Sequence, residues 1–256
     1  MAEPNPYERP AGERDVVAHT PSMPSSPGVG FHVLAAITTL SVLIALYWIA
    51  FRAPIESSMG IVQKIFYFHA PSGYGMYVGA AACFVGSAGY LARGTQGWDS
   101  LARAGAEVAV VMGVILMTTG PLWARKSWGV WWTWDPRLTT SLLSVLIYVA
   151  YVVLREFASG GEAEKKFAAA LGVLGAANLP IIHYSVRKWG GTHPQVVTGK
   201  GGGLQHVDMK IALLLGFAAF TFLSITLIWL RARQDMVRAR LEHAEEEALQ
   251  LGVVED

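Results

Sequence analysis

The sequence predicts an all-α fold: a polytopic membrane protein with about six transmembrane helices and a tryptophan-rich segment at one membrane surface. Hydrophobic residues make up 53% of the 256 residues and charged residues only 15%, and the mean hydropathy is +0.37. The apolar residues are also grouped, because six segments are long enough, or nearly so, to cross a hydrocarbon core as helices. The alternative is a soluble all-α protein whose long helices are buried in a core.

The expected spans cover residues 31–51, 75–91, 106–123, 138–154, 167–184 and 211–230. Residues 1–30 are polar and contain six of the 12 prolines, a composition that predicts a disordered N-terminal tail. The second span contains Cys83, the single cysteine of the chain, which we expect to serve as a small apolar packing residue. The third span contains Glu107 and ends at Gly120 and Pro121.

The fifth span contains Asn178 and Pro180. Because polar groups inside a membrane need partners, we expect Asn178 and Glu107 to face the interior of the helix bundle. For Glu107, a position near the helix end is the alternative. Residues 231–256, after the sixth span, carry charges of both signs and are expected to form a helical C-terminal tail with a solvated face.

The distribution of positive charge predicts the topology. An even number of spans places both termini on one side, and that side carries 11 of the 20 Lys and Arg residues while the opposite side carries 9. Cytoplasmic loops are richer in these residues, so we expect both termini to be cytoplasmic. The tryptophan-rich segment then lies on the opposite face of the membrane.

The segment 128–140 is the most distinctive part of the chain. It places four of the nine tryptophans within seven residues, namely Trp128, Trp131, Trp132 and Trp134. A short helix would gather the first three into one aromatic face. Asp135 is expected to cap the next helix, with Pro136 at its first position. Because tryptophan favours the membrane–water boundary, the segment predicts a flat aromatic plate on the membrane surface.

Several kinds of chemistry are excluded. A single cysteine excludes an intramolecular disulfide, a CxxC redox pair and a CxxCH haem attachment site. A run at 198–201 resembles a phosphate-binding loop, but Pro194 and Gly201 stand where that loop requires Gly and Ser or Thr. Neither G-x-S-x-G nor H-E-x-x-H occurs. We therefore expect no ATP or peptide hydrolysis, and no nucleic-acid partner.

Histidine is the remaining candidate for chemistry. Four of the seven histidines fall on the side of the tryptophan-rich segment, namely His69, His183, His193 and His206. His69 lies just before the second span and His183 at the end of the fifth. Two imidazoles near one membrane face, with aromatic rings between them, suit an iron porphyrin. Its propionates could meet cations on the same side, namely Arg125, Lys126, Arg137 and Arg187.

Each of these residues also has a structural interpretation. The tryptophans could be interfacial anchors only, and the histidines hydrogen-bonded residues at helix ends. Asp135 would then be a helix cap, while Arg137 would extend to the interface or pair with Asp135.

Three motifs resemble a known family. Residues 128–140 resemble the signature W-G-x-x-W-x-W-D-x-R-L-T of the tryptophan-rich "WWD" proteins, which handle haem in membranes. Within that superfamily, residues 64–72 (KIFYFHAPS) and 178–186 (NLPIIHYSV) resemble the histidine regions of the cytochrome c maturation protein C family, also called haem exporter protein C. The length and the six-span layout agree, so the resemblance covers residues 31–230.

The resemblance implies a multi-pass protein of the bacterial inner membrane that handles haem during c-type cytochrome biogenesis. It implies that the tryptophan-rich segment faces the periplasm and that His69 and His183 are the axial ligands of haem b. The remaining members of the implied site are Trp128, Trp131, Trp132, Trp134, Asp135 and Arg137. Trp189 and His193 stand where the family has a paired Trp and a Leu-His, so the resemblance gives these two residues no role.

The resemblance also implies the partners. The protein would present haem to a periplasmic haem chaperone, cytochrome c maturation protein E. It would do so in complex with the ABC transporter subunits A and B and the small membrane protein D. On this interpretation it is a haem-handling protein and not an enzyme.

Three alternatives remain. The first is a cytochrome c haem lyase component of the same superfamily, such as maturation protein F or the system II synthase. The second is the membrane permease subunit of an ABC exporter that moves haem itself. The third is a haem-independent scaffold of the transporter complex, in which the tryptophans are only anchors.

Overall fold

The computed structural model describes residues 27–157, 161–191, 193 and 204–250. The described chain is helical apart from its connections, and the predicted all-α class is confirmed. Its long helices are α2 (Val29–Tyr47), α3 (Phe66–Arg93), α4 (Gln96–Trp128), α5 (Pro136–Phe157), α6 (Glu162–Trp189) and α7 (Val207–Gln250). A π-helical turn, η2 (Trp48–Arg52), continues α2, and a 3₁₀ turn, η3 (Ile61–Ile65), precedes α3.

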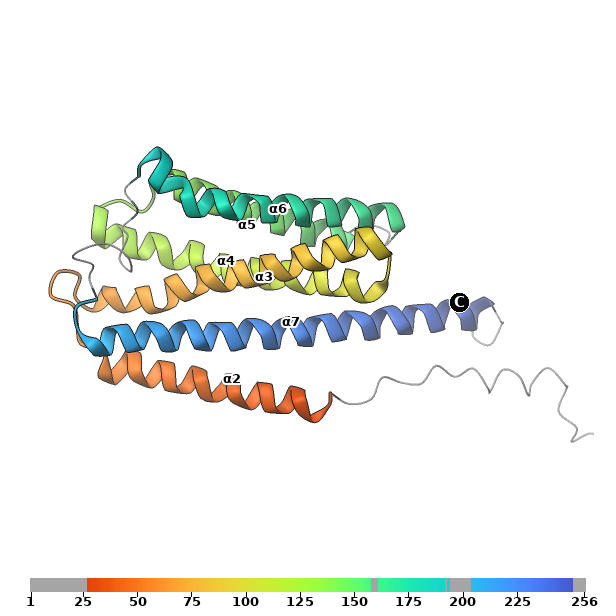
Figure 1. Ribbon diagram of the computed structural model, residues 1–256, viewed down its shortest axis with the longest axis horizontal. Coiled ribbons are helices and arrows are strands. Elements are labelled where there is room, and N and C mark those ends of the chain that lie inside the picture. Colours follow the sequence, from red (N-terminus) through yellow and green to blue (C-terminus); the bar gives the residue numbers. More distant parts are fainter. Residues whose placement is uncertain (1–26, 158–160, 192, 194–203, 251–256) are drawn as a thin grey trace, which may run out of the picture.

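The six helices run side by side along the long axis of the molecule (Figure 1). Helices α2 and α7 lie on one side, α3 and α4 in the middle, and α5 and α6 on the other side. Each of the six is long and apolar enough to cross a membrane, so the predicted number of spans is confirmed. The start of α2 and the end of α7 lie at the same end of the bundle, as an even number of spans requires.

The helices extend well beyond the apolar segments that the sequence delineates. Helix α3 begins at Phe66 instead of residue 75 and continues through Pro71, and α4 begins ten residues earlier than expected, at Gln96. The reason is that the polar residues of these extensions find partners on neighbouring helices. Asp99, in the extension of α4, pairs with Arg155 of α5. Glu107 lies well inside α4 and pairs with Arg231 of α7. The alternative position near a helix end is therefore wrong.

Close contact between α3 and α4 forms the centre of the bundle. A Cβ atom on Gly79 would lie 2.5 Å from the backbone nitrogen of Ala109, and one on Gly105 would collide with the backbone of Cys83. Small residues permit such an approach, which membrane helices use because apolar burial alone does not drive them together. Cys83 is completely buried in this contact, in agreement with its expected packing role.

Polar contacts join the outer helices to one another in pairs. Asn178 of α6 donates from Nδ2 to the Oγ of Ser144 (2.7 Å) and to the carbonyl of Thr140 (2.8 Å), both on α5. Its side chain faces the bundle interior, as predicted, and the residue is 6% exposed. Thr38 of α2 meets Thr226 of α7 through their hydroxyl oxygens at 2.7 Å.

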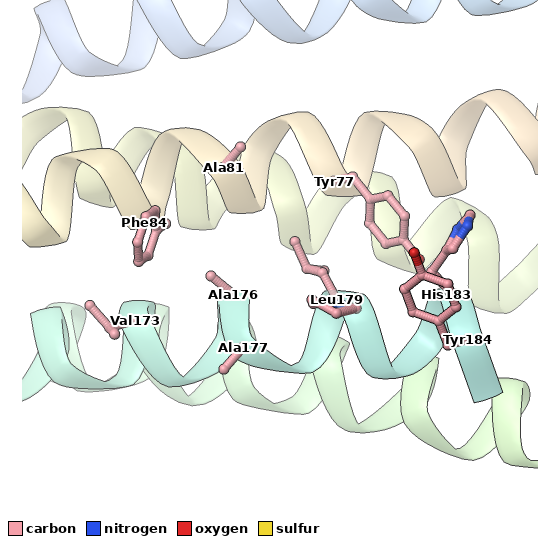
Figure 2. Close-up of a pocket in the computed structure, with 10 residues that line it drawn as sticks. Tyr77, Ala81, Phe84, Val173, Ala176, Ala177, Leu179, His183 and Tyr184 are labelled. Carbon is pink, nitrogen blue, oxygen red and sulfur yellow. The ribbon is translucent and has the colours of Figure 1, made fainter. Parts of the chain in front are cut away.

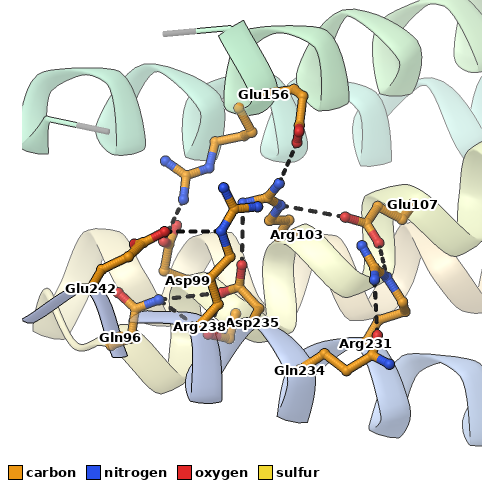
Figure 3. A network of polar contacts seen from close by, with 12 residues as sticks. Gln96, Asp99, Arg103, Glu107, Glu156, Arg231, Gln234, Asp235, Arg238 and Glu242 are labelled. Carbon is orange, nitrogen blue, oxygen red and sulfur yellow. Dashed lines mark hydrogen bonds and ion pairs between the residues drawn. The ribbon is translucent and has the colours of Figure 1, made fainter. Parts of the chain in front are cut away.

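Helix α7 continues to Gln250, so the helical extension expected for residues 231–256 is confirmed as far as residue 250, and the last six residues lie outside the described part of the chain. Its 44 residues correspond to about 66 Å at 1.5 Å per residue, roughly twice the hydrocarbon thickness. Figure 3 shows that its extension is held by charged contacts, including one of 3.2 Å between Arg103 and Asp235. Of the N-terminal tail predicted for residues 1–30, residues 1–26 lie outside the described part of the chain. The last two residues of that range are helical and not disordered, because α2 begins at Val29.

Candidate haem site

One cavity brings the predicted histidines together with part of the tryptophan-rich segment. Its volume is about 540 Å³, and it lies where α3 begins and α4 ends, with α5, α6 and α7 completing its walls. Five of the eight predicted site residues line it, namely His69, His183, Trp128, Trp132 and Arg137. Cofactor pockets typically have volumes of about 300–1,000 Å³. The cavity is therefore large enough for a cofactor.

His69 is held against α4. It lies in the first turn of α3, and its Nδ1 is 3.0 Å from the Oγ1 of Thr119. The neighbouring Gly120 leaves room for the ring, because a Cβ atom there would lie 3.2 Å from the Cε1 of His69. The imidazole therefore has a fixed position on the cavity wall.

His183 has a different environment. It lies near the end of α6 and is exposed, and its ring meets that of Tyr184 edge to face, with a centroid distance of 5.0 Å. Figure 2 shows His183, Tyr184 and Tyr77 gathered at one end of a second hollow, an apolar groove between α3 and α6. Tyr77 and His183 line both the groove and the cavity, so they form the boundary between the two.

The tryptophan rings do not form the predicted flat plate. Helix α4 ends at Trp128, and Gly129 follows in the left-handed conformation (φ 75°), which ends the helix. The short helix expected to gather Trp128, Trp131 and Trp132 therefore does not form, and that prediction is wrong. Instead, Trp128 and Trp132 line the cavity, whereas Trp131 and Trp134 are 56% and 76% exposed.

The exposed rings still contact the rest of the segment. The ring of Trp134 lies edge to face against Trp132, with centroids 5.8 Å apart. The guanidinium carbon of Arg125 lies 6.0 Å from the centroid of Trp131. Trp131 and Trp134 thus form a rim next to the cavity wall.

Asp135 caps α5, as predicted. Its Oδ1 accepts a hydrogen bond from the backbone N–H of Arg137 at 2.8 Å, and Pro136 occupies the first helical position. Its other carboxylate oxygen accepts from the backbone N–H of His193 at 3.4 Å. Asp135 is 5% exposed and does not line the cavity, so it acts by shaping the backbone around the site.

Arg137 joins α5 to the end of α6. Its guanidinium donates to the carbonyl oxygens of Ile182 (3.5 Å) and His183 (3.4 Å) and lies 3.4 Å from the Nδ1 of His193. The side chain therefore lies across the end of α6. Arg187 is a second cation on the cavity wall.

Sequence reasoning missed several wall residues. Trp123 lines the cavity and meets Trp128 edge to face, with centroids 6.0 Å apart. Gly73 and Tyr77 also line it. They follow His69 at four and eight residues along α3, so helical spacing could have identified them. The predicted start of that span at residue 75 separated His69 from the helix and hid this signal.

The wall residues suit a haem. The rings of Trp123, Trp128 and Trp132 give the wall an aromatic surface that suits an apolar macrocycle. The described residues contain no cluster of three His, Cys, Asp or Glu side chains that could hold a bare metal ion. A porphyrin supplies four nitrogens of its own, so two imidazoles are enough to complete the coordination of its iron.

Comparisons with known proteins agree with this chemistry. A family model described as "Heme exporter protein C" matches residues 18–247. The chain is 34% identical to the Heme exporter protein C of Bradyrhizobium diazoefficiens over 215 residues. The matched region covers 81% of this chain and 79% of the relative. It is 31% identical to the protein of that name from Escherichia coli (strain K12), over 78% of this chain and 81% of the relative.

A plant protein also matches. The chain is 27% identical to a "Putative cytochrome c biosynthesis ccmC-like mitochondrial protein" of Marchantia polymorpha, over 74% of this chain and 81% of the relative. The similarity therefore extends over most of the described helices.

Proposed function

Because this chain belongs to the haem exporter protein C family, which handles haem for cytochrome c biogenesis, we propose that it binds haem in the cavity and delivers it to a periplasmic haem chaperone. The observation that carries the proposal is the meeting of His69, His183, Trp128 and Trp132 on one cavity wall. These residues come from α3, α4, α6 and the loop before α5. Their meeting is therefore a property of the tertiary fold and not of one local motif.

His69 and His183 are the proposed axial ligands of haem b. The bound haem would supply the iron and the vinyl group at which the chaperone becomes attached, and the protein supplies position. Neutral imidazole is the ligand form of histidine, so protons compete with iron for both rings. Trp128 and Trp132 would pack against the apolar macrocycle.

The polar wall groups suit the propionates. Arg137 and Arg187 are the cations on the wall. Charge-assisted hydrogen bonds from such groups would fix the orientation of the porphyrin in its plane.

Trp131, Trp134 and Asp135 complete the proposed site at its edge. The two exposed rings would meet the chaperone where haem leaves, because exposed aromatic side chains are common contact residues in interfaces. Asp135 holds the start of α5, and with it the backbone of Arg137.

The proposed partners follow from the family. The chaperone would be cytochrome c maturation protein E, and the assembly would contain the ABC transporter subunits A and B and the small protein D. We place the chain in the bacterial inner membrane with the cavity facing the periplasm and both termini in the cytoplasm. Four arginines close to the end of the last apolar segment support this orientation, namely Arg231, Arg233, Arg238 and Arg240.

We also propose that the transmembrane haem-handling domain comprises residues 31–230, between the cytoplasmic tails 1–30 and 231–256. Within it the protein would orient haem and would not itself catalyse a reaction. The permease alternative is less well supported. Its polar pathway would need free intramembrane polar groups, whereas Glu107 and Asn178 are both engaged with neighbouring helices.

The test is the visible absorption spectrum of the detergent-purified full chain, co-expressed with the chaperone. We expect a haem Soret band in the wild type that weakens or shifts in both His69→Ala and His183→Ala. His206→Ala is the matched control, because His206 is an exposed histidine just before α7 that does not line the cavity. A haem-free wild type that still assembles with the transporter would favour the scaffold alternative.

A further inference from the structure

The hydrogen bond between His69 and Thr119 has a defined direction. The hydroxyl of Thr119 lies 2.7 Å from the carbonyl oxygen of Ile115, one turn earlier on α4. A carbonyl can only accept, so the single hydroxyl hydrogen of Thr119 is directed to Ile115. The oxygen of Thr119 then accepts from the Nδ1 of His69, 3.0 Å away. Nδ1 therefore carries the proton.

This direction fixes the chemistry of the other ring nitrogen. A neutral imidazole has one protonated and one unprotonated nitrogen, so a proton on Nδ1 leaves a lone pair on Nε2. The ring also makes a hydrogen bond to the backbone of Leu116, on the same stretch of α4 as Thr119. Nε2 remains available to a metal.

We propose that Thr119 is a positioning residue for haem: it holds His69 as the Nδ1–H tautomer and so presents the lone pair of Nε2 to the iron. This inference rests on the proposed function. Histidine ligands of metals commonly donate their second N–H to an oxygen, which fixes the ring and increases its basicity. The hydroxyl of Thr119 is polarised further by its own bond to Ile115.

The two proposed ligands then differ. The ring of His183 packs against Tyr184 and makes no hydrogen bond within the described part of the chain. His183 is also exposed and lies at the boundary between the cavity and the apolar groove. Thr119 thus makes His69 the fixed ligand and leaves His183 as the ligand that gives way when haem is passed on.

The tautomer can be measured without haem. The experiment is NMR of the full-length chain in detergent, with ¹⁵N-labelled histidine and the His69 signals assigned by their loss in His69→Gln. We expect the Nδ1–H tautomer in the wild type and in Thr119→Ser, and a shift toward the Nε2–H tautomer in Thr119→Val. The control is Thr118→Val, because Thr118 makes the same bond one turn back, to Val114 at 2.8 Å, but is exposed.

The second readout is haem affinity of the same variants, measured by titration. Removal of such a partner usually costs about 10- to 100-fold in metal affinity, and we expect a loss of that size in Thr119→Val. Thr119→Ser should restore affinity, and Thr118→Val should leave it unchanged. An Nε2–H tautomer in the wild type, or equal affinity and tautomer in Thr119→Val, would overturn the inference. A wild type that binds no haem would instead overturn the proposed function, while the NMR result would still decide the role of Thr119 toward His69.

Discussion

Arg155, near the end of α5, forms an ion pair of 2.7 Å with Asp99, in the first turn of α4, and both side chains are almost fully buried. The same guanidinium reaches Glu164 of α6 at 3.2 Å. Three helices therefore meet at one charged group, at the end of the bundle opposite the candidate haem site. The charged contacts of Figure 3 that hold α7 lie at this end as well.

We expect Arg155→Leu to destabilise the protein strongly. Loss of the guanidinium removes the cation that lies 2.7 Å from the buried carboxylate of Asp99, which keeps only the longer contact of 3.8 Å with Lys165, and it also breaks the ion pair with Glu164. Breaking a buried pair in this way costs about 3–5 kcal/mol. The measurement is unfolding of the detergent-solubilised chain by heat or SDS. Lys166→Ala is the control, because its pair with Glu162 is exposed and should contribute nothing measurable. Equal effects of the two substitutions would contradict the prediction.

The contact between α3 and α4 should not tolerate a larger residue. Gly105→Ala would place a Cβ atom into the backbone of Cys83, and we expect the resulting overpacking to destabilise the protein by about 1–3 kcal/mol. Gly97→Ala is the matched substitution on the same helix, because nothing lies within 4 Å of a Cβ atom there. It should be neutral or slightly stabilising in the same unfolding assay. A neutral Gly105→Ala would contradict the close approach of α3 and α4 at this residue.

Asn178 and Ser144 should be energetically coupled. Their side chains form a buried hydrogen bond of 2.7 Å between α6 and α5. Interhelical bonds of this kind in membrane proteins have coupling free energies of about 0.6 kcal/mol on average and at most about 1.7 kcal/mol. A double-mutant cycle of Asn178→Ala and Ser144→Ala measures this quantity, and additive effects of the two substitutions would argue against the contact.

The tryptophans should separate into two functional groups. We expect Trp128→Ala to weaken haem binding about 10-fold, which corresponds to roughly 1.4 kcal/mol of lost contact, because its ring lines the cavity. We expect Trp134→Ala, at an exposed ring, to change affinity by no more than about two-fold but to slow haem transfer to the chaperone. Haem titration and covalent labelling of the chaperone measure the two effects. Equal losses of affinity in both variants would contradict the division.

Much of the candidate site could be predicted from the sequence. His69, His183 and the tryptophan-rich segment stand in local motifs, so their residue types and spacing are visible without a structure. Thr119 could not be predicted, because it lies 50 positions from His69 and meets it only through the packing of α4 on α3. Trp123 could not be predicted for a related reason, since it joins the cavity through the position of α4.

The sequence by itself determined the class of the protein, its six spans and the cap at Asp135. These are local properties: a chain in hydrocarbon must satisfy its backbone hydrogen bonds within each segment, so apolar length is enough to specify a spanning helix. The tertiary structure alone decided that Trp128 and Trp132 face the cavity while Trp131 and Trp134 face outward. That outcome depends on the rotation, depth and ending of each helix, which are set by contacts between residues distant in the chain.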